Sequence, residues 1–162
     1  MKKIGILSDT HAYWDDRYAE YFAGCDEIWH AGDIGSVEII EKLSKVATLR
    51  AVYGNIDGTP VKLLTAKTLR FRVEQTEVLL THIGGYPGKY APEIKDELLR
   101  DTPDLMVCGH SHILKVMFDK KLNMLHINPG AAGKYGFHKV RTLIRFVIDK
   151  EEMKDLEVIE LA

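Results

Sequence analysis

Short hydrophobic runs alternate with amphipathic segments in the first third of the chain. Three runs with few polar residues are predicted to be buried strands, at 3–8, 27–31 and 49–53. Between them, residues 15–22 carry aromatic residues on one side of a predicted helix, and a second helix is predicted after Ser36, a suitable N-cap. Alternation of strand and helix is typical of βαβ units, so we expect a parallel sheet here.

The remainder of the chain has a pattern dominated by strands. One helix is predicted at 93–100, just after Pro92. The predicted strands lie at 68–73, 77–81, 105–108, 114–118, 124–127, 142–148 and 156–161. No linker or repeat interrupts this pattern. We therefore expect one domain over residues 1–162 with a mixed α/β core, in which two sheets pack face to face.

Composition limits the class of protein. The 162 residues are 46% hydrophobic and 28% charged, as in ordinary globular domains that fold without disulfides. Only Cys25 and Cys108 occur, and no run approaches the roughly 20 apolar residues of a membrane span, so we expect a cytoplasmic protein without a membrane partner. The net charge of -2 provides no general attraction to nucleic acid, which is not an expected partner.

Metal-binding side chains follow five of the predicted strands. These residues are Asp9, His11, Asp33, Asn55, His82, His110 and His112. Open α/β sheets bind ligands at the carboxyl ends of their strands, so we expect the seven side chains to meet at one edge.

The chemistry of this set points to a pair of metal ions. Carboxylate and imidazole donors without thiolate suit Mn, Fe, Ni or Zn. Seven ligands exceed the need of one tetrahedral ion, whereas two ions sharing one carboxylate would use them all. Pairs of ions ~3.5–4 Å apart stabilise the attacking and leaving oxygens of a displacement at phosphorus. With only two carboxylates, Asp9 and Asp33, the loaded site would stay positive and attract a phosphate anion.

The same residues carry a family resemblance. In order along the chain, five blocks resemble those of the calcineurin-like metallophosphoesterases: Asp9-x-His11, Gly32-Asp33, Gly54-Asn55-x-Asp57, His82 and Gly109-His110-x-His112. The chain is most similar to the small, single-domain YfcE-like branch, which His30-Ala31 and Asn128-Pro129-Gly130 also resemble. The resemblance implies a four-layer α/β/β/α fold, with two mixed β-sheets packed face to face and flanked by helices.

The resemblance also implies the chemistry. It assigns Asp9, His11 and His112 to one metal ion, Asn55, His82 and His110 to the other, and Asp33 to a bridge between them. The implied cofactors are two divalent cations, with Mn²⁺ expected first and Ni²⁺, Fe²⁺, Zn²⁺ or Mg²⁺ as alternatives. The implied reaction is hydrolysis of a P–O bond in a small phosphodiester by a bridging metal-bound hydroxide.

Further residues are predicted to support this reaction. We expect catalytic roles for Asp33, Asn55, Asp57 and His82, although Asp57 could equally brace its loop. His30, three residues before Asp33, is expected to lie behind the ligands. Two loops are predicted to form the substrate cleft, with contacts from Tyr86, Lys89, Tyr90 and His138.

One departure from the family pattern keeps other functions open. Many members have His after the Asn of the third block, but this chain has Ile56, which cannot transfer a proton. The alternative is a catalytically weak or inactive scaffold that binds protein partners, as the retromer subunit resembling this branch does. A nuclease is a third possibility, but it usually has a basic groove or added domains. The sequence leaves open whether the protein forms a homo-oligomer.

Overall fold

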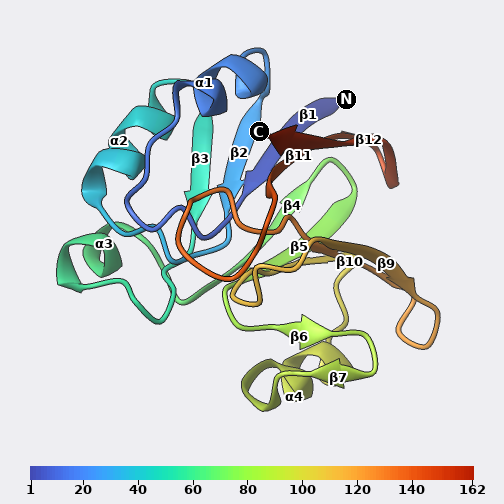
Figure 1. Cartoon of the computed structure of the whole chain (residues 1–162). Coiled ribbons are helices and arrows are strands. Elements are labelled where there is room, and N and C mark those ends of the chain that lie inside the picture. Colours follow the sequence, from blue (N-terminus) through green and yellow to red (C-terminus); the bar gives the residue numbers. More distant parts are fainter.

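Five strands from both ends of the chain form the first sheet. The computed structural model describes residues 1–162, and this sheet has the order β12-β11-β1-β2-β3 (Figure 1). Its strands are β1 (Lys2–Leu7), β2 (Glu27–His30), β3 (Thr48–Ala51), β11 (Arg141–Asp149) and β12 (Glu152–Leu161). The N-terminal strands β1, β2 and β3 are parallel, as their pattern predicted, and β11 joins β1 in antiparallel orientation.

The middle of the chain forms the second sheet, in the order β4-β5-β8-β10-β9. Its strands are β4 (Thr68–Val73), β5 (Thr76–Thr81), β8 (Leu105–Val107), β9 (Lys115–Asp119) and β10 (Met124–Asn128). The inner strands β5, β8 and β10 are parallel, whereas the edge strands β4 and β9 are antiparallel to their neighbours. Both sheets are therefore mixed.

Helices cover the outer faces of the two sheets. The helices are α1 (Asp16–Phe22), α2 (Val37–Ser44), α3 (Thr59–Leu64) and α4 (Pro92–Arg100). Side chains of α1, α2 and α3 pack in one apolar cluster with β1 and β2, and α4 packs on β5 and β8 of the second sheet (Figure 1). This arrangement confirms the four-layer α/β/β/α fold.

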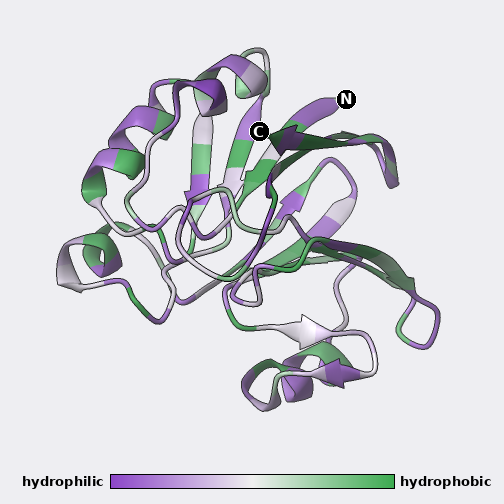
Figure 2. Ribbon diagram, in the orientation of Figure 1, coloured by the Kyte–Doolittle hydropathy of each residue, from purple (hydrophilic) through white to green (hydrophobic).

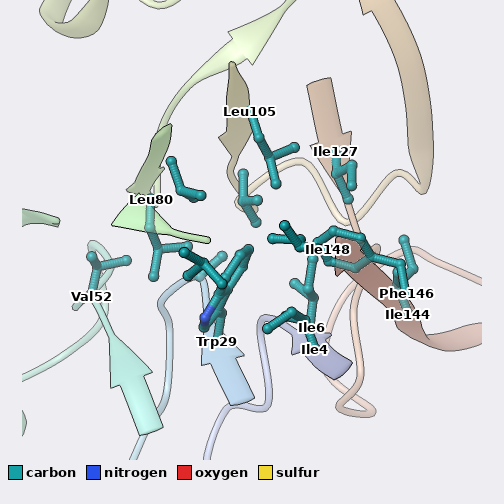
Figure 3. Close-up of a cluster of buried hydrophobic side chains, with 14 residues drawn as sticks. Ile4, Ile6, Trp29, Val52, Leu80, Leu105, Ile127, Ile144, Phe146 and Ile148 are labelled. Carbon is teal, nitrogen blue, oxygen red and sulfur yellow. The ribbon is translucent and has the colours of Figure 1, made fainter. Parts of the chain in front are cut away.

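A third apolar cluster fills the space between the sheets. Trp29 lies near its centre, with its ring edge-on to Phe71 at 5.1 Å and to Phe146 at 5.8 Å. Strands of both sheets direct side chains toward it, as Figure 3 shows for Ile6 and Leu80. Burying each such side chain stabilises the folded state by roughly 1.5–3 kcal/mol, so this cluster determines how the two sheets pack against each other.

Several elements differ from the sequence expectations. The helix α3 and the short hairpin of β6 (Gly85–Tyr86) and β7 (Lys89–Tyr90) were not predicted, because each is too short to show a periodic pattern. Strand β12 begins at Glu152, four residues before the expected start, since this edge strand is largely exposed and lacks apolar alternation. No helix has the length and apolar character needed to cross a membrane.

Candidate metal centre

The predicted metal ligands converge from both sheets. They follow β1, β2 and β3 of the first sheet and β5 and β8 of the second. Two groups result in which one ligand atom of each residue lies within 4.8 Å of the others: Asp9, His11 and His112, and Asp33, His82 and His110. Asn55 joins the second group, because its Oδ1 lies 3.0 Å from Nε2 of His82 and 3.1 Å from Nδ1 of His110. All seven predicted residues therefore lie together.

The backbone at these ligands is strained. Five of them have positive φ although none is glycine: Asp9, His11, Asp33, His110 and His112. Such conformations cost on the order of 1–3 kcal/mol each and cluster at functional sites. The sharp turns direct ligands from short loops into the two groups, and His110 and His112 of one loop reach different groups, so the strain is part of how the site is built.

Asp9 is held through one oxygen and leaves the other free. Its Oδ2 accepts hydrogen bonds from the hydroxyl of Ser8 at 2.6 Å and from the backbone N–H of His110 at 3.1 Å. Its Oδ1 is buried without a hydrogen-bond partner, 3.2 Å from Nε2 of His112. The loops are so close here that a Cβ on Gly109 would lie 2.1 Å from the Ser8 hydroxyl oxygen.

Asp33 lies between the two groups. Its Oδ2 is 3.5 Å from Nε2 of His11 and 3.3 Å from Nε2 of His82, while its Oδ1 accepts from the backbone N–H of Ile56 at 3.1 Å. One oxygen therefore faces an imidazole of each group. This is the position that a bridging carboxylate requires.

Burial and charge move the histidine pKa values in opposite directions. Burial lowers the pKa of His11 despite the nearby Asp33 and Asp9. The Asp9 carboxylate, 3.2 Å from Nε2 of His112, raises the pKa of that histidine. Burial alone would lower the pKa of His82, but its hydrogen bond to Asp33 and the charge of Asp9 outweigh burial and raise it.

The ring of His82 is held in place through its far nitrogen. Its Nδ1–H donates to the backbone oxygen of Ala31 at 2.7 Å, which fixes the ring and directs Nε2 toward Asp33 and Asn55. A backbone acceptor on the far nitrogen is the usual support of a metal-binding imidazole.

Asp57 braces the loops rather than facing the ligands. Its buried carboxylate accepts three backbone N–H bonds, from Gly35 at 2.8 Å, Gly54 at 2.8 Å and Ile34 at 3.1 Å. These bonds tie the loop after β3 to the loop after β2. Because both oxygens are used, the geometry favours bracing, and a catalytic role for Asp57 stays a prediction.

His30 lies behind the ligands, fully buried. Its Nδ1 accepts from the backbone N–H of Gly32 at 3.1 Å, and its Nε2–H donates to the hydroxyl of Thr10 at 3.0 Å, which itself donates to Ile34. Burial lowers its pKa to about 4, so the ring is neutral at physiological pH. His30 therefore fixes the loops that carry Asp9 and Asp33.

The predicted substrate residues lie in different places. Only His138 shares a cavity with ligands, a space of about 410 Å³ that also touches His112 and Tyr135. The hydroxyl of Tyr90 donates to Asp119 at 2.5 Å, so the structure does not bring this side chain to the ligands. Lys89 shares no contact or cavity with the ligands either.

Tyr86 lines another cavity, with Ser111, Lys115 and His126. Its ring lies 4.6 Å from the Lys115 ammonium group. The β6–β7 hairpin thus lies beside β9 and α4, and its cavity reaches Ser111, between His110 and His112. That this loop contacts a substrate stays a prediction.

Another cavity beside the ligands was not predicted from the sequence. A space of about 220 Å³ adjoins Asn55 and His82 and is lined by Tyr53, Lys62 and Lys67. Lys62 lies on α3, directly after the third block, and its position could have suggested this role. Lys67 lies directly before β4. No local sequence pattern indicates that this segment reaches the cavity.

The donor set fits divalent cations. Oδ1 of Asp9 and Nε2 of His11 are buried, lack hydrogen-bond partners and lie 3.9 Å apart. Buried polar atoms are rarely left unpaired, and a cation between these two would satisfy both. Asp33, Asn55, His82 and His110 provide a second set of oxygen and nitrogen donors that suits the same class of ion.

Comparison with known sequences supports the chemistry of this centre. The model of the calcineurin-like phosphoesterase superfamily domain matches residues 1–151. A probable metallophosphoesterase of Methanothermobacter thermautotrophicus is 31% identical over 136 residues, which cover 79% of this chain and 76% of that protein. A second, from Methanocaldococcus jannaschii, is 31% identical over 140 residues and covers 79% of this chain and 67% of that protein.

Solved structures share the fold. An archaeal phosphodiesterase superposes with a TM-score of 0.76 at 24% identity, covering 98% of this chain and 99% of the other. A single mutant of Vps29 from Entamoeba histolytica superposes with a TM-score of 0.74 at 16% identity over 99% of both chains. At these identities the likeness establishes architecture alone.

Proposed function

Because the chain belongs to the calcineurin-like phosphoesterase superfamily, we propose that it is a phosphodiesterase with a two-metal centre. The family establishes metal-dependent hydrolysis of phosphoric esters. The observation that carries the finer proposal is the position of Asp33, with one oxygen facing an imidazole of each ligand group. We expect Mn²⁺ first, with Ni²⁺, Fe²⁺, Zn²⁺ or Mg²⁺ as alternatives, and the oxygen and imidazole donors suit divalent cations of this class.

Each ligand group would hold one cation. Asp9, His11 and His112 form one set, Asn55, His82 and His110 form the other, and Asp33 would be shared. When bound, the two cations supply a nucleophile from water and neutralise charge on the reacting phosphate.

The protein's own residues hold this arrangement. Ser8 and the N–H of His110 fix Asp9, while the N–H of Ile56 and the loop braced by Asp57 fix Asp33. Cations bind neutral imidazoles, and the pKa values of His82 and His112 are raised in the ligand-free protein, so protons compete with cations at these two rings.

A phosphodiester is favoured over a monoester by the absence of added positive charge at the ligands. Lys62 and Lys67 only line the cavity beside Asn55 and His82, and Lys67 already lies 3.8 Å from Glu93. The exposed Ile56 beside Asp33 offers no proton to a leaving group. We therefore expect activated diesters, which need no general acid, to react fastest.

Hydrolysis of bis-p-nitrophenyl phosphate tests the proposal. The protein is stripped with chelator and assayed with Mn²⁺, Ni²⁺, Zn²⁺ or Mg²⁺, beside Asp33→Ala and a control, Asp96→Ala, which removes an exposed carboxylate from α4. We expect turnover that requires metal, is lost in Asp33→Ala and persists in Asp96→Ala. Faster turnover of p-nitrophenyl phosphate than of the diester would reverse the preference for diesters.

A scaffold is the second candidate, supported by Ile56 and by the structural likeness to Vps29. Measuring both bound metal and turnover on the same protein preparation distinguishes the two functions. Two bound cations without hydrolysis of any ester would favour the scaffold. Turnover that Asp33→Ala abolishes would favour the enzyme.

A further inference from the structure

Strand β9 leaves one edge of the second sheet apolar and unpaired. It bonds to β10 on one side only, and Val116, Met117 and Phe118 are 41%, 47% and 49% exposed. Ile113 and Leu114, directly before it, are exposed as well. Figure 2 shows the hydrophobic colour extending along β9 and β10 to this edge of the molecule. Contiguous exposed apolar surface marks interaction sites, and an unpaired strand offers free N–H and C=O groups.

Both faces of β9 contribute to this surface. Val116 and Phe118 lie opposite Ile127 and Leu125 of β10, which pack in the cluster between the sheets. The apolar layer of the core thus continues onto β9, where nothing covers it. Met117 projects from the other face of the sheet, beside the buried His126. An edge that is apolar on both faces fits a partner strand better than a partner that covers one face.

The other sheet edges are protected in ways that β9 is not. Arg70 and Arg72 lie on β4 and pair with carboxylates. The chain beyond β3 is covered by a bridge between Val52 and Ala66. Strand β12 carries five charged residues, which flank its exposed Leu156 and Val158: Glu152, Lys154, Asp155, Glu157 and Glu160. Charged or covered edges prevent strand pairing between molecules, and β9 has neither protection at its centre.

We propose that β9 pairs antiparallel with β9 of a second copy of this chain, about a two-fold axis at Met117. The apolar centre of this strand, Val-Met-Phe, is self-complementary in this register. Val116 faces the partner's Phe118, and the two Met117 side chains meet on the axis. Apolar pairs stabilise antiparallel neighbours, and a two-fold axis uses the same surface on both copies.

The dimer would join the two second sheets into one ten-stranded sheet. A strand pair of five residues is a small interface, so we expect it to dissociate on dilution. This inference is independent of the proposed hydrolysis, because β9 contributes none of the seven metal ligands.

Sedimentation velocity over a concentration series tests the pairing. The wild-type chain is expected to shift from one to two chain masses as its concentration rises. Met117→Lys places two like charges on the axis and should raise the dissociation constant at least tenfold. The matched control is Leu99→Lys, which changes an exposed leucine on α4 and should leave the dimer intact. A wild-type chain that stays monomeric, or a Met117→Lys variant that dimerises like wild type, overturns the proposal.

A cysteine variant tests the register and does not depend on how the lysine variant folds. Directly opposed residues of an antiparallel pair have Cα atoms roughly 4.5–5.5 Å apart, which a disulfide can span. Met117→Cys should therefore form a cross-linked dimer under mild oxidation, whereas Leu99→Cys should not. The native cysteines are both buried and should not interfere. Absence of the cross-link in Met117→Cys contradicts a two-fold axis at this residue.

Discussion

Gly54 lies so close to Asp33 that a Cβ on the glycine would fall 2.1 Å from the carboxylate Oδ1 and 2.4 Å from the backbone nitrogen. The loops after β2 and β3 can meet only because residue 54 has no side chain. The glycine of the third block therefore sets where the carboxylate between the two ligand groups can lie.

Gly54→Ala is expected to displace the Asp33 carboxylate. Contact with backbone cannot be relieved by rotating a side chain, so we expect a loss of about 1–3 kcal/mol in the free energy of unfolding. Metal affinity should fall roughly 10–100-fold, as when a supporting group of a metal ligand is lost. Calorimetric titration with Mn²⁺ measures this. The control is Gly58→Ala, whose Cβ would meet only Pro60, at 3.9 Å; equal effects of both substitutions would contradict the role of the close approach.

Asp57→Asn is expected to reduce the stability of the protein more than its rate of hydrolysis. The amide keeps one acceptor oxygen for three N–H donors, so we expect a loss of about 2–4 kcal/mol in urea unfolding. At saturating metal, turnover should fall less than tenfold, whereas loss of a general acid or base typically costs 10²–10⁴-fold. Asp96→Asn on the exposed face of α4 is the control. A variant as stable as wild type but catalytically dead would instead assign Asp57 to the reaction.

Divalent cations are expected to stabilise the folded protein. They would satisfy buried groups that have no partner, such as Oδ1 of Asp9. At a free concentration 100 times the dissociation constant, one bound ion adds about 2.7 kcal/mol. Thermal unfolding with Mn²⁺ and then with excess chelator measures the gain and its reversal. Asp33→Ala should reduce the gain sharply, and an unchanged gain in this variant would place metal binding elsewhere.

His126 is expected to make the protein sensitive to acid. Its ring is buried, neither nitrogen has a hydrogen-bond partner, and burial, assisted by the charge of Lys115, lowers its pKa to about 4. The unfolded histidine titrates near 6.5. Between these pH values, His126 binds a proton in the unfolded chain but not in the folded chain. The free energy of unfolding therefore falls as the pH drops from about 6.5 toward about 4.

His126→Phe removes this proton linkage and leaves no polar group unpaired. Between about pH 7.5 and about pH 5, wild type should lose about 2 kcal/mol more unfolding free energy than the variant. Urea unfolding at both pH values, with chelator present, measures the difference. The buried His30 should leave some acid sensitivity in both proteins, because its pKa is also lowered to about 4. An identical pH dependence of the two proteins would contradict the account.

The sequence by itself determined the strands and the kinds of ligand atom. Runs such as 4–7 and 105–108 are apolar without interruption because both faces of these parts of β1 and β8 are buried, so the local sequence pattern shows the burial. The type and order of the ligands also follow from the chain, since each stands directly after such a strand. Elements of a single turn, such as α3, leave no comparable pattern.

Only the tertiary structure decided which side chains meet across the two sheets. Asp33 and His82 belong to different sheets, and packing around Trp29 is what brings their side chains within 3.3 Å. The same holds for two other predicted residues: the hydroxyl of Tyr90 binds Asp119, and Asp57 binds three backbone N–H groups. The apolar residues 116–118 predict a strand but not that it lies at an edge. Strand order arises from contacts between distant segments, and no local pattern contains it.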